Sequence, residues 1–197
     1  IRDISYRYGS DTVLSHFSYT FEKGFIYGIT APSGTGKTTL LNLIGNILKP
    51  AQGEIETDFK TGIAYVFQEP ELLSQLTIAE NIALPLAAYL KKEIAFEQAI
   101  SILQKMELDG FENRFPNELS FGQQQRAAIA RALTYPSPLL LMDEPFKGLD
   151  EALSRRIIKR IRERQTENGQ TILFTSHNPG ELRLFADKTV RLDPTSH

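Results

Sequence analysis

The chain has 197 residues and a mass of 22.2 kDa, enough for one well-packed domain with an inserted subdomain and too little for two unrelated domains. Its formal net charge of -2 argues against a general polyanion partner such as non-specifically bound nucleic acid. The absence of cysteine excludes disulfides and thiolate metal sites, and charge-free runs such as Gly24 to Gly36 fall short of the roughly 20 apolar residues of a membrane-spanning helix.

The first 30 residues predict three strands. Apolar and aromatic side chains alternate in residues 1–8 and again in residues 13–21, with the turn-forming Gly9-Ser10-Asp11 between them. This pattern favours a pair of antiparallel strands. The apolar run Phe25 to Thr30 then predicts a buried strand.

A loop suited to phosphate follows that strand and precedes an amphipathic run, Thr39 to Leu48, which we expect to form a helix ending near Lys49-Pro50. The loop reads Ala31-Pro32-Ser33-Gly34-Thr35-Gly36-Lys37-Thr38. Its backbone N–H groups, the positive helix end, the Lys37 ammonium and the Thr38 hydroxyl suit a nucleoside triphosphate and its Mg²⁺. Ala31 replaces the first glycine of the G-x-x-x-x-G-K-[ST] pattern, so we expect slight strain there.

The middle of the chain predicts an inserted helical subdomain over residues 69–118. Short strands are expected at Gly53 to Thr57 and Gly62 to Phe67, and residues 77–106 then take a helical spacing in which Pro85 should kink or split the first helix. Residues 1–68 and 119–197 would form the nucleotide-binding core of a single domain spanning 1–197.

The last third alternates helices and strands. Helices are expected at Leu119 to Thr134 and Glu151 to Glu167, and strands at Leu139 to Met142, Thr171 to Thr175 and Lys188 to Leu192. The predicted fold is therefore α/β: a P-loop NTPase core, mostly a parallel sheet with flanking helices, plus an N-terminal antiparallel β subdomain and the helical insertion.

Polar residues follow three of the predicted buried strands, and parallel strands share one carboxyl edge. Asp143 would join the Mg²⁺ shell and Glu144 would orient the attacking water, although an Asp-Glu pair can also simply end a strand. His177 would hydrogen-bond the γ-phosphate and help hold that water. Gln68 offers a carbonyl to metal or water.

Ser120-Phe121-Gly122-Gln123 opens a second helix with little side-chain bulk at Gly122, which makes a second anion site. One nucleotide has a single γ-phosphate, yet two helix ends suit it. A natural arrangement is that the second end belongs to another copy of the chain, so that ATP lies between two protomers. The alternative is an ordinary capped helix.

With these residues in order, the chain resembles the ATP-binding subunit of ABC transporters over essentially its full length. Residues 31–38 look like the family's Walker A motif, Gln68 the Q-loop, residues 119–123 the signature motif, residues 139–144 Walker B, residues 148–150 the D-loop and His177 the switch histidine. The third signature position, usually glycine, is Phe121 here, and its ring must point away from the phosphate if the helix end is to close on it.

The resemblance implies which residues bind the nucleotide, carry out catalysis and hold the metal. Nucleotide contacts would come from Tyr8, which stacks on adenine, and from Ala31, Pro32, Ser33, Gly34, Thr35, Gly36, Lys37, Thr38, Thr39, Ser120, Gly122, Gln123 and Asp150. Catalysis would use Glu144, His177, Gln68 and Lys37, and the metal would be held by Thr38, Gln68 and Asp143.

The resemblance also implies partners. A second copy or a paralogous subunit would complete an ATP sandwich, and separate transmembrane permease subunits would receive the motion through the helical subdomain at the cytoplasmic face of the membrane. The run Asp143-Glu144-Pro145-Phe146 is similar to that of bacterial importers, which favours import and allows for a solute-binding protein. No nucleic-acid partner is expected.

Two alternatives remain open. A soluble ABC-type ATPase acting on nucleic acid or ribosomes is favoured only by the basic residues between Arg155 and Arg164, whose charges are balanced by Glu151, Glu163 and Glu167. A P-loop kinase would need an acceptor site and would not need residues 120–123 or a dimer.

Overall fold

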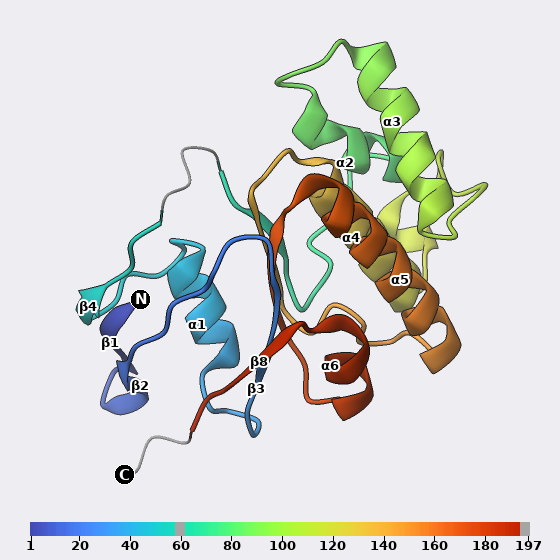
Figure 1. The fold of residues 1–197 in the computed structure, drawn as a ribbon. Coiled ribbons are helices and arrows are strands. Elements are labelled where there is room, and N and C mark those ends of the chain that lie inside the picture. Colours follow the sequence, from blue (N-terminus) through green and yellow to red (C-terminus); the bar gives the residue numbers. More distant parts are fainter. Residues whose placement is uncertain (58–61, 194–197) are drawn as a thin grey trace.

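A computed structural model describes residues 1–57 and 62–193. It contains one five-stranded sheet, one three-stranded sheet and the helices packed around them (Figure 1). In the described part of the chain, no helix is both long and apolar enough to cross a membrane.

The five-stranded sheet has the order β5-β6-β7-β3-β8, and every neighbouring pair in it is parallel. Its strands are β3 (Ile26–Thr30), β5 (Ala64–Val66), β6 (Leu139–Met142), β7 (Thr171–Thr175) and β8 (Lys188–Arg191). The central strands β6 and β7 are buried along their whole length, as continuous apolar runs in a sheet covered on both faces require. The predicted parallel sheet is confirmed.

Successive residues of a strand face opposite sides of the sheet, and the core divides accordingly. Leu139 and Leu141 of β6 join one buried cluster with α1 (Lys37–Ile44), whereas Leu140 and Met142 join the other cluster with the remaining helices. Figure 1 shows α1 on one side of the sheet with the small sheet, and α4, α5 and α6 on the other.

The small sheet has the order β2-β1-β4, with both pairings antiparallel. Its strands are β1 (Arg2–Tyr8), β2 (Asp11–Phe17) and β4 (Gln52–Glu54). The predicted N-terminal antiparallel pair is confirmed. The strand expected between Gly53 and Thr57 completes this sheet, although it begins one residue earlier and is shorter.

The end predicted for the first helix is wrong. We expected it near Lys49-Pro50, but α1 ends at Ile44. Gly45 caps the helix, and Asn46 then takes a left-handed conformation with φ of 56°, which a right-handed helix cannot continue. The short side chain of asparagine tolerates that conformation, so the chain turns before proline is reached.

The inserted helices pack on the helix that follows them. They are α2 (Ile78–Ala83), the 3₁₀ turn η1 (Leu84–Leu86) and α3 (Lys92–Lys105), followed by the 3₁₀ turn η2 (Pro116–Glu118) and α4 (Phe121–Thr134). The α-helix gives way to η1 where Pro85 stands, because proline has no N–H to donate. The split expected at Pro85 is thus found, while the boundaries at residues 69 and 118 remain predictions.

The chain ends with α5 (Glu151–Asn168), β7, α6 (Pro179–Phe185) and β8. The helix α6 was not predicted. It is short and begins with Pro179 at its first position, where the missing N–H costs nothing.

Glu107 joins the end of α3 to two other helices. Its carboxylate accepts two hydrogen bonds from Arg156 of α5, at 2.8 and 2.9 Å, and lies 3.1 Å from Arg160. Its backbone carbonyl accepts a 2.5 Å hydrogen bond from Arg126 of α4. We call these four residues the Glu107 clasp. It holds the inserted helices to the part of the chain that carries α5.

We expect Glu107→Gln to lower the free energy of unfolding by about 1 kcal/mol at neutral pH, because a partly exposed two-point ion pair is lost. The hydrogen bonds from Arg156 lower the pKa of Glu107 from its ordinary 4.5, so the stabilisation is present above that pH and is lost as the pH falls through the lowered value. Urea unfolding of both proteins at several pH values measures the difference, which should shrink in acid.

Glu163→Gln is the matched control, because the one ion pair that Glu163 makes among the described residues is with Lys159 of its own helix, at 3.9 Å. We expect it to change stability by less than about 0.5 kcal/mol. Equal stability of Glu107→Gln and the wild type at neutral pH would contradict the clasp.

Candidate functional site

Several of the sequence-predicted site residues follow the carboxyl ends of four neighbouring strands. Gln68 follows β5, Asp143 and Glu144 follow β6, His177 follows β7, and the loop 31–36 follows β3. The order β5-β6-β7-β3 makes these strands consecutive in the sheet, and all of them point the same way. Ligands of open α/β sheets bind at this edge.

Two glycines shape the loop between β3 and α1. Gly34 and Gly36 have φ of 79° and 89°, a region that other residues rarely adopt. A Cβ on Gly36 would also lie 2.7 Å from Val13 of β2. Lys37, only 8% exposed, donates hydrogen bonds to the carbonyls of Ala31 at 2.9 Å and Pro32 at 3.2 Å. The lysine therefore lies across the curve of the loop.

The strain expected at Ala31 is not found. Ala31 is not among the residues with positive φ, and its side chain packs in the core cluster that contains α1. Only a positive φ or a close approach requires glycine, and neither applies at this position. Alanine therefore fits here.

The first turn of α1 faces this loop and carries no acidic side chain, and its last turn carries no basic one. The positive end of the helix dipole is thus not neutralised by the helix's own residues. Backbone N–H groups, this dipole and Lys37 together make a site for an anion.

Asp143 is 2% exposed and is held by two neighbours, Val66 and Thr175. Its N–H donates to the carbonyl of Val66 at 2.8 Å, and its Oδ1 accepts a 2.5 Å hydrogen bond from the hydroxyl of Thr175. Burial and the nearby Asp143 charge raise the pKa of Tyr65, whose hydroxyl stays protonated and donates to Asn42 at 2.9 Å.

Glu144 adopts a left-handed backbone conformation, with φ of 44°. Its N–H donates to the Thr175 hydroxyl at 2.9 Å, and its Oε1 lies 3.4 Å from Nδ1 of His177. The Glu144 side chain is mostly buried, whereas the His177 side chain is 73% exposed. The structure thus brings Asp143, Glu144 and His177 together.

Gln68 lies two residues after the end of β5, which pairs with β6 in the sheet. The carbonyl of the preceding residue, Phe67, accepts a long 3.5 Å hydrogen bond from the buried Gln125 of α4. On α4, Arg131 donates to the carbonyls of Pro70 and Glu71 at 3.3 and 2.8 Å. The segment around Gln68 is therefore tied to α4.

Ser120 caps α4 as predicted. Its Oγ accepts from the N–H of Gln123 at 3.4 Å, and Oε1 of Gln123 accepts from the N–H of Ser120 at 2.8 Å. This is a capping box, in which both side chains serve the start of the helix. A Cβ on Gly122 would lie 2.7 Å from the carbonyl of Gly148, so the helix start packs tightly on the loop after β6.

The ring of Phe121 lies against the same loop. Gly148 has φ of 79°, and a Cβ there would meet the ring at 2.8 Å. The ammonium of Lys147 lies 5.7 Å from the ring centre and 3.6 Å from the carboxylate of Glu69. Contacts within its own chain therefore account for the place of the Phe121 ring.

The other two predicted nucleotide contacts lie on different elements. Tyr8 ends β1, is 52% exposed and meets Tyr6 edge to face with ring centres 5.0 Å apart. Asp150 caps α5, where its Oδ1 accepts from the N–H of Leu153 at 2.8 Å. The structure thus offers Tyr8 a free ring face and leaves Asp150 one oxygen beyond its capping bond.

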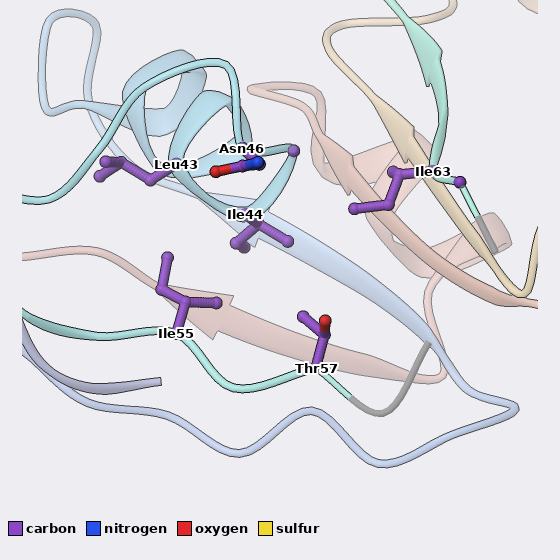
Figure 2. Close-up of a pocket in the computed structure, with 8 residues that line it drawn as sticks. Leu43, Ile44, Asn46, Ile55, Thr57 and Ile63 are labelled. Carbon is purple, nitrogen blue, oxygen red and sulfur yellow. The ribbon is translucent and has the colours of Figure 1, made fainter. Parts of the chain in front are cut away.

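A pocket of about 410 Å³ lies at the opposite end of α1 from the phosphate loop (Figure 2). Figure 2 shows that its walls come from Leu43, Ile44 and Asn46 at the end of α1 and from Ile55, Thr57 and Ile63. None of the described residues that line it is titratable.

Sequence reasoning missed Thr175. The residue appears as an ordinary β-branched member of a buried strand, yet its hydroxyl contacts both Asp143 and Glu144. The signal available in the sequence was a hydroxyl directly after the apolar residues Ile172 to Phe174, two residues before His177.

Comparison with known proteins identifies the class. The family model described as ABC transporter matches residues 14–147, about two thirds of the chain. The chain belongs to the ABC transporter family. It has the family's ATP-binding cassette, which binds and hydrolyses ATP.

Individual relatives cover most of the chain. It is 38% identical over 184 residues to the thiamine import ATP-binding protein ThiQ of Shigella flexneri serotype 5b and to that of Escherichia coli strain UTI89, covering 88% of this chain and 79% of each relative. A dimeric structure of the ATP-binding cassette MJ0796, in a post-hydrolysis state with ADP and Pi, superposes with a TM-score of 0.89 at 32% identity, covering 98% of this chain and 93% of that chain. A second dimeric structure of MJ0796, described as a bacterial ABC transporter cassette, gives a TM-score of 0.88 at 31% identity, covering 97% and 92%.

We expect Gly148→Ala to lower the free energy of unfolding by about 2–3 kcal/mol, because the new Cβ combines an unfavourable φ with a collision against Phe121. Thermal and urea unfolding measure this cost. Adding Phe121→Ala in the same chain should recover part of it.

Gly169→Ala serves as the control. Gly169 has φ of 65° but no atom within 4 Å of its ideal Cβ, so only the backbone cost applies, about 1 kcal/mol. If Gly148→Ala costs no more than Gly169→Ala, the Phe121 ring does not constrain this loop.

Proposed function

We propose that this chain is the ATP-hydrolysing subunit of an ABC importer and that the predicted site residues carry its chemistry. The observation that carries the proposal is the arrangement at the sheet edge, where the phosphate loop, Asp143-Glu144 and His177 follow consecutive parallel strands. The phosphate loop and the first turn of α1 bind the triphosphate, with Lys37 reaching its terminal phosphates.

The residues present fit Mg²⁺. Thr175 occupies Oδ1 of Asp143, and the other carboxylate oxygen has no hydrogen-bond or ion-pair partner among the described residues. Asp143, the Thr38 hydroxyl and the Gln68 carbonyl are oxygen ligands, which Mg²⁺ prefers. Bound there, Mg²⁺ would neutralise charge on the phosphates.

Glu144 and His177 handle the attacking water and the γ-phosphate. The Glu144 carboxylate lies at the end of β6, where it can accept hydrogen bonds from a water and align its oxygen with the phosphorus. His177 lies 3.4 Å away and is exposed, so its imidazole is free to turn toward a phosphate oxygen.

A second protomer completes the site. At the start of α4, Ser120 is exposed and Gly122 and Gln123 are partly exposed, and the cassette structures that superpose on this chain are dimeric. In the proposed dimer this helix start contacts the γ-phosphate that is bound by the partner's phosphate loop. Tyr8 stacks on adenine, and Asp150 lies at the interface between the two protomers. A paralogous subunit could take the place of the second copy.

The membrane partners are separate permease subunits, to which the helical insertion, residues 69–118, passes the motion at the cytoplasmic face. The names of the similar thiamine import proteins support import, and a solute-binding protein is a further partner in such a system. The permease selects the cargo, because the site described above has groups for phosphate chemistry alone.

The basic residues of α5 do not support a nucleic-acid partner. Arg156 and Arg160 contact Glu107, Arg162 contacts Asp187 at 2.8 Å, and Arg164 donates to the carbonyl of Leu133. Arg155 and Lys159 pair with Glu151 and Glu163 of the same helix. These side chains neutralise and cap this protein's own groups, which leaves no unpaired basic stripe for phosphates.

We expect Glu144→Gln to reduce ATP hydrolysis at least 100-fold and to accumulate a dimer with ATP, because the closed state can form but the water is no longer oriented. Size-exclusion chromatography with and without Mg-ATP, together with a phosphate-release assay, measures both effects. Lys37→Ala is the control, since it removes a phosphate contact and should stay monomeric and inactive. A Glu144→Gln protein that stays monomeric with ATP would contradict the sandwich.

We expect a tagged form of this chain to retain polytopic membrane proteins when it is purified from gently solubilised membranes of its own cells. Mass spectrometry identifies them, and a solute-binding protein encoded beside them would support import. Co-purification with ribosomes or nucleic acid in place of membrane proteins would favour the soluble ATPase instead.

A further inference from the structure

We propose that Thr175 is a positioning residue for ATP hydrolysis, because one buried hydroxyl fixes both acidic residues at the end of β6. This inference rests on the proposed roles of Asp143 and Glu144. The Thr175 hydroxyl donates to Oδ1 of Asp143 at 2.5 Å and accepts from the N–H of Glu144 at 2.9 Å. A hydroxyl has one proton and two lone pairs, so it can do both at once.

The two bonds act on different parts of the two residues. The bond to Asp143 fixes a side chain: with Oδ1 engaged, the carboxylate can turn only its other oxygen toward a ligand. The bond to Glu144 fixes a backbone, because the N–H lies in a residue with φ of 44°. Non-glycine residues in this region persist when their surroundings hold them there. Thr175 therefore orients the metal-side carboxylate and the turn that aims the Glu144 side chain.

The place of Thr175 in the sheet suits this role. It is the last residue of β7, the strand between β6 and β3, and it is fully buried. Its neighbour Ser176 donates its N–H to the carbonyl of Ile29 at 3.2 Å, which ties this strand end to the strand that leads into the phosphate loop. The Thr175 hydroxyl is thus part of the rigid sheet, whereas Glu144 and His177 lie in the segments that follow the strands β6 and β7.

A purely structural role would look different in experiments. Thr171, at the other end of β7, is also buried, and its hydroxyl accepts a 3.0 Å hydrogen bond from the N–H of Gly24, away from the acidic residues. Thr171→Val is therefore a matched control: it removes one buried hydroxyl from the same strand without touching Asp143 or Glu144.

The experiment compares Thr175→Val, Thr175→Ser and Thr171→Val with the wild type. Valine keeps the branched shape and removes the hydroxyl, and serine keeps the hydroxyl and removes the methyl. For Thr175→Val we expect kcat to fall about 10-fold, equivalent to about 1.4 kcal/mol of barrier, while KM for ATP changes less than two-fold. Thr175→Ser should retain kcat within three-fold, and Thr171→Val within two-fold.

Hydrogen–deuterium exchange gives a readout that does not depend on turnover. The Glu144 amide donates its hydrogen bond to Thr175, which protects it from exchange. In Thr175→Val, a peptide that covers residues 143–146 should exchange at least five-fold faster at one site. In Thr171→Val, the exchange rate of the same peptide should not change.

Each outcome decides the question. A fall in kcat below five-fold for Thr175→Val, an equal fall for Thr171→Val, or a Thr175→Ser protein as slow as Thr175→Val would overturn the inference. If Thr175→Val does not fold, Thr175→Cys, whose S–H is a weak donor, is judged by the same limits. If the wild type itself hydrolyses no ATP beyond Lys37→Ala, the proposed function fails, and exchange at Glu144 alone decides whether Thr175 holds this turn.

Discussion

The parallel pairing of four strands is the constraint on which the rest of the structure depends. Backbone hydrogen bonds place β5, β6, β7 and β3 side by side with their carboxyl ends at one edge. Residues that are up to 146 positions apart in sequence, from Ala31 to His177, therefore meet at one place. The apolar strands supply rigidity, and the polar residue that follows each strand supplies the chemistry.

Helices then fix the loops that emerge from this edge. The start of α4 packs on the loop around Gly148, and Arg131 holds the carbonyls of the segment after Gln68. The Glu107 clasp ties the far end of the insertion to α5. Helix α4 thus contacts two of the loops that carry site residues. The insertion packs on α4, so a movement of the insertion would reach both loops. In the proposed transporter, this contact would couple hydrolysis to a membrane partner.

Sequence patterns predicted the architecture, and they proposed the candidate site residues, because each signal was local. Apolar runs gave the strands, Ser120 and Gln123 gave the start of α4, and the phosphate loop followed from glycines, Lys37 and Thr38. The end of α1 was predicted wrongly because Asn46 was not expected to adopt a left-handed conformation before Pro50 was reached. Thr175 and the Phe121–Gly148 contact were missed because both depend on residues that only the fold brings together.

The first turn of α1 has a further consequence for the protein as a whole. Its dipole and N–H groups have no acidic side chain of the helix to compensate them, so a bound phosphate would complete the helix that packs one face of the sheet. Ligand binding and folding are then thermodynamically linked: the melting temperature should follow the nucleotide concentration, as any ligand that prefers the native state requires. In a cell rich in ATP, the nucleotide would act as part of the protein's own scaffold.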